Sequence, residues 1–406
     1  MNRFVVVGAG PAGLSLALQL SRTGHSVALV EASRQFSRQF RGDALMPCGQ
    51  EALARMGLSD LVASLPQRPL AGWSVWVNGR KLFAVAEPMG SLQPCRLVPQ
   101  QLLLEALLAE ALQEPHLQWH PGQAMKRLQR SRGRICGVEL ADGRRLEADL
   151  VVGCDGRQSL VRREAGIQLR QRGQGLEVLW FELPGPLPAD LNGGFSTHLC
   201  GGALGSSCIG ARGELQLAWL LENGGPTPQR TPQAWGDAWA QLLPPPLANV
   251  VRERAAELQG PLRVSVQVGL AKRWHQPGLL LLGDAAHPMS PVRAQGINMA
   301  LRDSLVAARL LSQATPEELD RAAAAVQQQR LPEIQRAQAL QSAEARQGHL
   351  VGHTPLLRAL LAQGRALLGP VAQGVWQARQ TPLREGLAGA LPANELSPQR
   401  TNSISW

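Results

Sequence analysis

The chain has 406 residues, of which 44% are hydrophobic and 18% charged, and it carries a formal net charge of +10. This length allows a large core divided between two lobes, and no apolar run approaches the ~20 residues of a membrane-spanning helix. Six cysteines without CxxC pairs and the lack of a signal peptide favour a reduced, cytoplasmic protein. No nucleic-acid-binding motif accompanies the basic excess, so we expect no nucleic-acid partner.

The first predicted elements are a strand over residues 4–7, a glycine-rich turn, a helix over 12–23 and a second strand over 26–30. This order is the dinucleotide-binding fingerprint in its βαβ context. Glycines permit the tight turn and let the backbone approach a pyrophosphate at the helix N-terminus, and an acid at the end of the second strand accepts hydrogen bonds from a ribose. The residues expected to bind the nucleotide, FAD or NAD, are Gly8, Gly10, Ala12, Gly13 and Glu31.

Beyond this unit the chain alternates between two patterns. Residues 72–85 and 134–146 are predicted hairpins around Asn78-Gly79 and Asp142-Gly143. The stretch 96–113 has a leucine-rich helical pattern, and 149–153 is a buried strand. Further along, the predicted strands are 177–183, 215–221, 262–268 and 279–282, and the predicted helices are 235–243, 297–311 and the chain after 316.

The sequence therefore predicts an α/β protein with a discontinuous, Rossmann-like nucleotide-binding lobe. Segments 1–70, 95–172 and 273–345 form this lobe, and 71–94 with 173–272 form a sheet-rich lobe for the substrate. We expect the C-terminal helices, 346–391, to pack on the nucleotide lobe, and the polar tail, 392–406, to be disordered.

Residues 279–303, LLLLGDAAHPMSPVRAQGINMALRD, decide which dinucleotide is bound. Asp284 follows a buried strand, where its carboxylate can accept hydrogen bonds from polyol hydroxyls. Gly296, Ile297 and Asn298 open the next helix, whose N-terminus would stabilise the negative charge of a reduced flavin. These features favour FAD.

Together with the fingerprint, this segment resembles the group A flavoprotein monooxygenases, the family of para-hydroxybenzoate hydroxylase and the ubiquinone-pathway hydroxylases. A third motif, VVGCDGRQSLVRREAG, matches the family's DG motif with Asp155, Gly156, Ser159 and Arg162. In the family, this segment lies between FAD and the nicotinamide cofactor.

The resemblance also implies FAD contacts for two arginines, Arg41 and Arg96, whose planar side chains suit phosphate. One departure is visible in the last motif. Where many relatives read Gly-Gln-Gly, this chain has Ala294-Gln295-Gly296, and the extra methyl group bears on how closely the loop meets the flavin.

By resemblance, NADH or NADPH docks transiently and reduces FAD, and O2 then forms a C4a-hydroperoxyflavin that hydroxylates an aromatic or apolar organic substrate. No side-chain nucleophile is implied. The chain contains no tyrosine, so a tyrosine relay cannot activate a substrate phenol. His287 is a replacement candidate if it faces the flavin, and otherwise it orders the Asp284 loop; Pro291 is a second candidate pocket residue.

Aromatic residues gather on the predicted strands of the sheet-rich lobe, where they suit an apolar substrate or simply the strand core. Two histidine pairs, His116/His120 and His349/His353, have helical i, i+4 spacing but no nearby third ligand, so we expect no metal site. The aromatic residues concerned are Trp73, Trp76, Phe83, Trp180, Phe181 and Trp219.

Two other functions stay open. A flavin-dependent reductase of prenyl chains or a halogenase shares the fold, although Trp73-Ser74-Val75-Trp76 lacks the Ile-Pro of the halogenase motif. Alternatively, the chain is a non-catalytic flavoprotein whose basic C-terminal helices, 356–391, contact a partner or act peripherally on a membrane surface. Gly364, Gly369 and Pro370 interrupt the periodicity that such a module needs.

Overall fold

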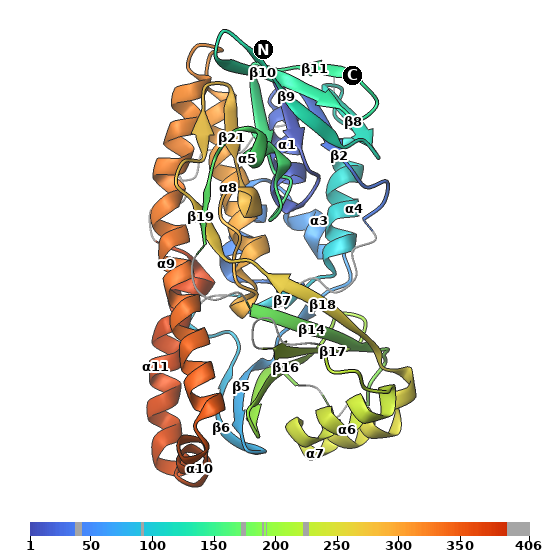
Figure 1. The fold of residues 1–406 in the computed structure, drawn as a ribbon, viewed down its shortest axis with the longest axis vertical. Coiled ribbons are helices and arrows are strands. Elements are labelled where there is room, and N and C mark those ends of the chain that lie inside the picture. Colours follow the sequence, from blue (N-terminus) through green and yellow to red (C-terminus); the bar gives the residue numbers. More distant parts are fainter. Residues whose placement is uncertain are drawn as a thin grey trace, which may run out of the picture.

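Figure 1 shows the computed structural model of the chain, which describes residues 1–36, 43–90, 93–171, 176–188, 191, 193–221 and 227–387. Two large sheets follow one another along the long axis, each with its own helices. The long helix α9 (Leu319–His353) runs beside both sheets. The predicted α/β class, with a nucleotide-binding lobe and a sheet-based lobe, is confirmed.

The upper sheet contains six strands in the order β20-β21-β12-β1-β2-β8, and only β20 is antiparallel to its neighbour. Its strands are apolar on both faces because each face is covered. In β1, Phe4 and Val6 belong to one core and Val5 and Val7 to the other. The bounds are β1 (Arg3–Val7), β2 (Ser26–Glu31), β8 (Leu117–Pro121), β12 (Leu150–Gly153), β20 (His275–Gln276) and β21 (Leu279–Leu281).

Helices cover one face of this sheet, and a small sheet and α9 cover the other. The helices are α1 (Pro11–Arg22), α2 (Pro47–Arg55), α3 (Ser59–Ala63), α4 (Gln100–Ala111) and α8 (Gln295–Ser312). The small sheet contains β9 (Met125–Ser131), β10 (Arg134–Leu140) and β11 (Arg145–Glu147). Short elements beside them are β3 (Ala44–Leu45), β4 (Arg68–Pro69), β7 (Arg96–Leu97), α5 (Leu160–Glu164), β13 (Leu169–Gln171), β19 (Gly269–Ala271), η3 (Gly283–Ala285) and η4 (Val292–Ala294).

The lower sheet contains seven strands in the order β18-β14-β17-β16-β15-β5-β6, antiparallel except for β15 and β5. Its side chains alternate between two faces. On one face, Leu179 and Phe181 of β14 pack against Trp235 and Trp239 of α6 (Pro232–Leu242), which lies beside α7 (Pro245–Glu253). On the other face, Val178 lines a cavity. The bounds are β5 (Gly72–Val77), β6 (Arg80–Ala86), β14 (Leu176–Leu183), β15 (Phe195–Cys200), β16 (Ala203–Ile209), β17 (Leu215–Leu221) and β18 (Gln259–Val266), and η2 (Ala255–Glu257) follows α7.

The C-terminal helices contact both lobes. Helix α11 (Arg365–Glu385) packs against α2 above and β6 below, and α10 (Pro355–Gln363) packs against α9, β5 and β6. A buried ion pair between Arg384 of α11 and Glu87, just after β6, fixes the helix to the lower lobe. The predicted packing on the nucleotide lobe is thus present at α2, whereas the contacts with β5 and β6 of the lower lobe were not predicted.

Most predicted elements agree with the structure to within a few residues, including both hairpins and the fingerprint helix. One strand was misplaced: β18 begins at Gln259 and ends at Val266, because pairing with β14 rather than local hydropathy sets its bounds. Helix α7 was not predicted, since its start is a run of three prolines, Pro244 to Pro246.

Candidate active site

A single cavity of about 2190 Å³ connects the two lobes. Its upper wall is the edge at which the parallel strands β1, β2 and β12 end, and its lower wall is one face of the seven-stranded sheet. A pocket for one small ligand typically has about 300–1,000 Å³. This cavity is therefore large enough for a dinucleotide and a second molecule together.

The glycine fingerprint forms one end of the cavity. Gly8 has φ +102°, and a Cβ there would lie 2.5 Å from the carbonyl oxygen of Cys154, so only glycine fits. A Cβ on Gly10, by contrast, would meet no protein atom within 4 Å, which leaves room for a ligand at the N-terminus of α1. Glu31 is fixed beside it, since its carboxylate accepts hydrogen bonds from the Ala9 N–H at 2.8 Å and the Ser33 N–H at 3.0 Å.

The motif after β12 contributes a second wall segment. Asp155 and Gly156 line the cavity, and Gly156 has φ +81°. Asp155 Oδ2 accepts hydrogen bonds from the first N–H groups of α5, at Leu160 and Val161, and burial raises the pKa of Asp155. Arg162 does not reach the cavity; its guanidinium donates to the carbonyls of Ala285 and Arg157 and so links this motif to the loop after β21.

The loop after β21 forms the third segment. Asp284 lines the cavity, where its carboxylate accepts a hydrogen bond from Arg157 Nε at 3.1 Å. Gly296 and Ile297, at the start of α8, also line it. Asn298 lies behind them, where its amide bonds Met46 N, Ala44 O and Ala294 O and so holds the start of α8 to residues 44–46.

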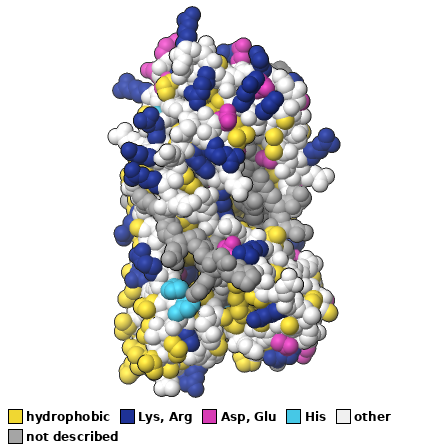
Figure 2. All heavy atoms as spheres, in the orientation of Figure 1, with side chains coloured by type: hydrophobic (Ala, Val, Ile, Leu, Met, Phe, Trp, Pro, Cys, Tyr) yellow, Lys and Arg dark blue, Asp and Glu magenta, His cyan; other side chains and the backbone are white. Residues whose placement is uncertain are grey.

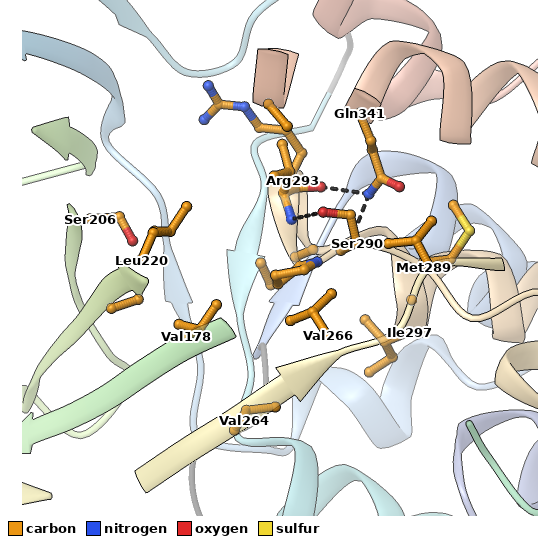
Figure 3. Close-up of a pocket in the computed structure, with 18 of the residues that line it drawn as sticks. Val178, Ser206, Leu220, Val264, Val266, Met289, Ser290, Arg293, Ile297 and Gln341 are labelled. Atoms are coloured by element: carbon orange, nitrogen blue, oxygen red, sulfur yellow. Dashed lines mark hydrogen bonds between the residues drawn. The ribbon is translucent and has the colours of Figure 1, made fainter. Parts of the chain in front are cut away.

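The lower wall is an apolar face. Side chains from six neighbouring strands stand in register across the sheet and all line the cavity. In order across the sheet they are Val264, Val178, Leu220, Leu204, Leu199 and Val77. Figure 3 shows Val178, Leu220 and Val264 of this row opposite Met289 and Ile297 of the upper lobe. A flat apolar surface of this kind suits a ring system.

The comparisons with known proteins agree with this geometry. The model of the family described as "FAD binding domain" matches residues 2–338. A 6-methylpretetramide 4-monooxygenase of Streptomyces rimosus is 33% identical over 357 residues, 84% of this chain and 83% of the relative. The chain belongs to the group A FAD-dependent monooxygenases. It is thus an FAD-dependent oxidoreductase that acts on a small organic molecule.

Other similar proteins also match this chain over most of their length. A 2-heptyl-3-hydroxy-4(1H)-quinolone synthase of Pseudomonas aeruginosa is 31% identical over 332 residues, 75% of this chain and 80% of the relative. Among solved structures, p-nitrophenol 4-monooxygenase PnpA of Pseudomonas putida has a TM-score of 0.76 at 17% identity and covers 96% of this chain and 100% of its own. PqsL of P. aeruginosa, in complex with 2-aminobenzoylacetate, has a TM-score of 0.73 at 22% identity and covers 92% and 99%.

The donor set fits FAD. A glycine turn with room for a ligand at Gly10, the fixed carboxylate of Glu31 and a polar loop at the start of α8 lie around one cavity. The predicted residues that line it are Gly8, Gly10, Ala12, Glu31, Asp155, Gly156, Asp284, Pro291, Gly296 and Ile297. Gly13, Arg96 and Asn298 are not among the lining residues. Arg96 Nη1 instead donates to Gln67 Oε1 at 2.9 Å, and Arg41 lies outside the described residues.

His287 lies behind the loop rather than in the cavity. It is 1% exposed, its ring packs at a tilt against Trp274, and its Nε2 lies 2.6 Å from Asp303 Oδ2. Asp303 Oδ2 also accepts a hydrogen bond from the Gly283 N–H at 3.1 Å. These contacts support the interpretation of His287 as a residue that orders the Asp284 loop, and they do not support its role as a pocket residue.

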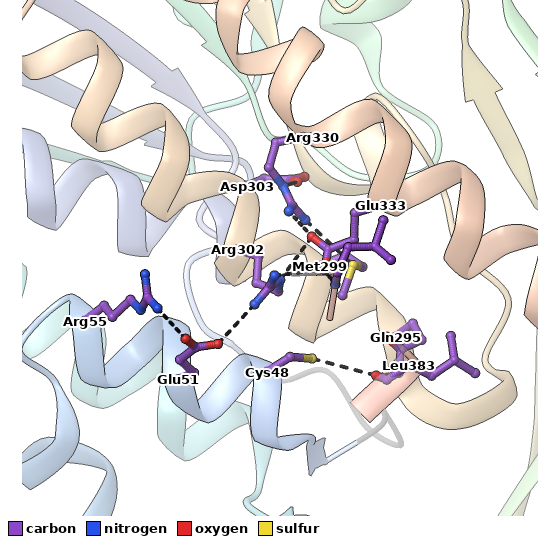
Figure 4. A network of polar contacts seen from close by, with 11 residues as sticks. Cys48, Glu51, Arg55, Gln295, Met299, Arg302, Asp303, Arg330, Glu333 and Leu383 are labelled. Carbon is purple, nitrogen blue, oxygen red and sulfur yellow. Dashed lines mark hydrogen bonds and ion pairs between the residues drawn. The ribbon is translucent and has the colours of Figure 1, made fainter. Parts of the chain in front are cut away.

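Asp303 belongs to a buried ionic network that Figure 4 shows from close by. Arg330 of α9 pairs with Asp303 and Glu333, and Arg302 of α8 pairs with Glu333 at 2.8 Å. All four side chains are at most 2% exposed. Burial opposes ionisation of Asp303, but His287 and Arg330 together lower its pKa. The network fastens α8 and α9 to the rear of the cofactor loop.

Arg293 is a cavity residue that the sequence analysis missed. Its guanidinium carbon lies 5.0 Å from the ring centre of Trp73, 5.8 Å from Phe195 and 4.8 Å from Trp376, and the group pairs with Glu344. Burial acts to raise the pKa of Glu344, but the charge and hydrogen bond of Arg293 outweigh it, so the pKa of Glu344 is lowered. The neutralised, ring-enclosed arginine therefore belongs to a wall that remains largely apolar.

Asp43 was also missed. It lines the cavity and joins the lobes: Oδ1 accepts a hydrogen bond from the Gln100 N–H, and Oδ2 accepts one from Gln216 Nε2 of β17 at 3.0 Å. Burial raises the pKa of Asp43 to about 6. A carboxylate with a raised pKa in a cleft is a typical functional-site feature, but no sequence motif marks it.

The predicted aromatic cluster is divided between the two faces of the lower sheet. Trp73, Phe83 and Trp180 line the cavity. Phe181 and Trp219 pack instead against Trp235 and Trp239 on the far side, and Trp76 lies near His198. Strand alternation thus separates cavity-facing rings from core rings.

Among the described residues, no three His, Cys, Asp or Glu side chains are grouped so as to hold a metal ion. None of the helices in that part of the chain combines the length and the hydropathy required of a membrane span.

Proposed function

We propose that this monooxygenase uses NADH or NADPH and O2 as co-substrates and hydroxylates a large, apolar aromatic molecule. The observation that carries the proposal is the continuity of one cavity from the glycine fingerprint to the apolar row of the lower sheet. The relatives lend support, because their names include a 6-methylpretetramide and a quinolone with a heptyl chain.

In this proposal the residues around the upper wall hold FAD. Gly8, Gly10, Ala12 and Glu31 bind its nucleotide part, and Asp155, Gly156, Asp284, Gly296 and Ile297 position the remainder. Gly13 and Asn298 act from behind the wall, Gly13 by the close packing of α1 on Gly8 and Asn298 by holding the start of α8. Arg41 stays a predicted contact, whereas the position of Arg96 beside Gln67 does not support one. When bound, FAD supplies the redox chemistry and the activation of oxygen. The N-terminus of α8 provides a positive dipole end toward the cavity.

The other residues act on the substrate. The six apolar side chains from Val264 to Val77 bind its ring system and exclude water, which oxygen transfer requires. Three of the arginines that line the cavity are paired with carboxylates, Arg293 with Glu344, Arg157 with Asp284 and Arg263 with Glu177. We therefore expect a substrate without an acidic group. Asp43, which joins the lobes through Gln216, is the acid of the cavity whose protonation changes near pH 6.

The test is incorporation of labelled oxygen. Purified protein with bound FAD is given NADH or NADPH, ¹⁸O2 and a panel of apolar and acidic aromatic compounds, and the products are analysed by mass spectrometry. We expect one ¹⁸O atom in the product of an apolar aromatic compound and faster NAD(P)H oxidation in its presence. A reduced product without ¹⁸O identifies a reductase, and preference for acidic compounds overturns the substrate class.

A further inference from the structure

The C-terminal helices expose large apolar side chains to solvent. Six of the nine exposed large hydrophobic residues in the described parts of the chain lie between residues 350 and 375. Leu356 is 84% exposed, Leu367 83% and Val371 66%; the other three are Leu350, Leu360 and Val375. Scattered exposed apolar residues are normal, whereas a concentration like this marks an interaction surface.

Five of these side chains lie on the adjoining helices α10 and α11, and Leu350 lies near the end of α9. Leu367, Val371 and Val375 are four residues apart and share a face of α11, and Leu356 and Leu360 share a face of α10. The two helices pack against each other. Figure 2 shows apolar side chains gathered at the lower left of the molecule, where Figure 1 places α10 and the lower end of α11. We call this surface, residues 350–375, the apolar end.

The charge around the apolar end has a single sign. Residues 345–384 contain no Asp or Glu, and their arginines are Arg346, Arg358, Arg365, Arg379 and Arg384. Arg358 and Arg384 are buried in contacts with the protein, whereas Arg346 and Arg365 are exposed. An exposed apolar surface with a cationic margin is typical of helices that lie in the interface of an anionic membrane.

The apolar end also borders the substrate cavity. The opposite sides of the same helices line it, through Leu361 of α10 and Ala372 and Trp376 of α11. Val375 belongs to both the apolar end and the cavity wall, since it lines the cavity and is 45% exposed. A molecule that leaves a lipid surface at the apolar end is therefore next to the chamber.

We propose that the apolar end docks this monooxygenase on an anionic lipid membrane and that the substrate enters the cavity from there. The second step rests on the proposed apolar substrate; the docking does not. A second copy of the chain is the less favourable occupant, because an isologous contact would place two surfaces of the same positive sign together, with no Asp or Glu in residues 345–384 of either copy. A lipid surface supplies the missing negative charge.

The experiment measures co-sedimentation of the FAD-loaded full chain with vesicles of phosphatidylglycerol and phosphatidylcholine, against vesicles of phosphatidylcholine alone. We expect binding to the anionic vesicles that falls with salt. The double variant Leu367→Glu, Val371→Glu, at side chains that do not line the cavity, should reduce binding about tenfold or more. The control is Leu112→Glu, which changes a 50% exposed leucine at the end of α4 and should bind like the wild type.

Three results would overturn the docking. These are a wild type that ignores anionic vesicles, equal losses in Leu112→Glu and the double variant, and a dimer in light scattering that the double variant dissolves. Flavin absorption and NAD(P)H oxidation without vesicles test the proposed function separately, and the double variant should leave both unchanged. If vesicles fail to increase turnover of an apolar aromatic compound that the wild type accepts in detergent, delivery from the membrane is refuted while docking stands.

Discussion

The two large sheets contribute to the cavity in different ways. The six-stranded, mostly parallel sheet presents its edge, so that Gly8, Glu31 and Asp155 lie at the carboxyl ends of β1, β2 and β12. The seven-stranded sheet presents a face, so that Val264, Val178 and Leu220 stand side by side in register. In open parallel sheets, ligands bind at the carboxyl ends of the strands. In antiparallel sheets, alternate side chains share one face.

We expect the edge of one sheet to serve cofactor binding and the face of the other to serve substrate binding. At the edge, turns and backbone groups make the contacts, so few residue types are acceptable there. On the face, side chains make the contacts, and apolar residues of similar size can replace one another without changing the strands. We therefore expect substitutions at the edge to affect FAD and stability, and substitutions on the face to affect the choice of substrate.

The largest effect is expected behind the edge. Arg330→Met leaves Asp303 and Glu333 without a buried partner, so the free energy of unfolding should fall by about 3–5 kcal/mol. Urea denaturation measures it. The control is Arg144→Met, which removes an exposed pair with Asp142 and should cost at most about 1 kcal/mol. Equal losses in the two variants would mean that the buried network does not support the loop.

At the edge itself, Gly10→Ala tests the cofactor cradle. No protein atom lies within 4 Å of the added methyl group, so the fold should be unaffected, while close approach of a pyrophosphate is blocked. FAD affinity should fall roughly ten- to hundredfold, measured by fluorescence titration of the apoprotein. Gly374→Ala, in α11, adds a methyl group that likewise meets nothing within 4 Å, and it should bind FAD normally.

Asp43 lies where the edge and the face meet, and we expect it to make the free energy of unfolding depend on pH. Because burial raises its pKa to about 6, its contribution to stability is fully present below about pH 4 and is lost as the pH rises through 6. Asp43→Asn cannot ionise. The free energy of unfolding of Asp43→Asn minus that of the wild type should therefore increase by about 1–3 kcal/mol between pH 4 and pH 7. Urea denaturation at several pH values measures the difference, and a constant difference would refute the assignment.

The same contrast explains what the sequence could predict. The fingerprint, the DG motif and the GD loop are local patterns at strand ends, so Gly8, Asp155 and Asp284 were found from the sequence. Whether a side chain faces the cavity, and how deeply it is buried, depends on residues far away along the chain. His287 is turned inward by Asp303 and Trp274, and Arg293 is enclosed by rings from three distant segments. Neither arrangement has a local signal.

On the face, Val264→Phe tests the substrate row. The larger side chain takes up part of the cavity that Val264 lines, so kcat/KM for a large aromatic substrate should fall about tenfold. FAD content and substrate-free NAD(P)H oxidation should stay at the wild-type level, which is the control within the same sample. Loss of FAD in this variant would contradict the separation of edge from face.

The smallest effect concerns Ala294, at the loop between edge and face. Its φ of 48° and ψ of 39° are left-handed, and Arg293 before it also has a positive φ of 60°. A non-glycine residue in this region costs about 1–2 kcal/mol, and glycine also adds entropy to the unfolded chain. Ala294→Gly should therefore raise the free energy of unfolding by about 0.5–1 kcal/mol.

The matched substitution Ala378→Gly, in the regular helix α11, should have the opposite sign and lower the free energy of unfolding by about 1 kcal/mol. Thermal and urea denaturation of both variants give the comparison. If Ala294→Gly is also destabilising, the methyl group makes a favourable contact that outweighs the backbone strain. The alanine in this motif would then stabilise the loop, and its departure from the glycine of many relatives would contribute to how the cavity is built.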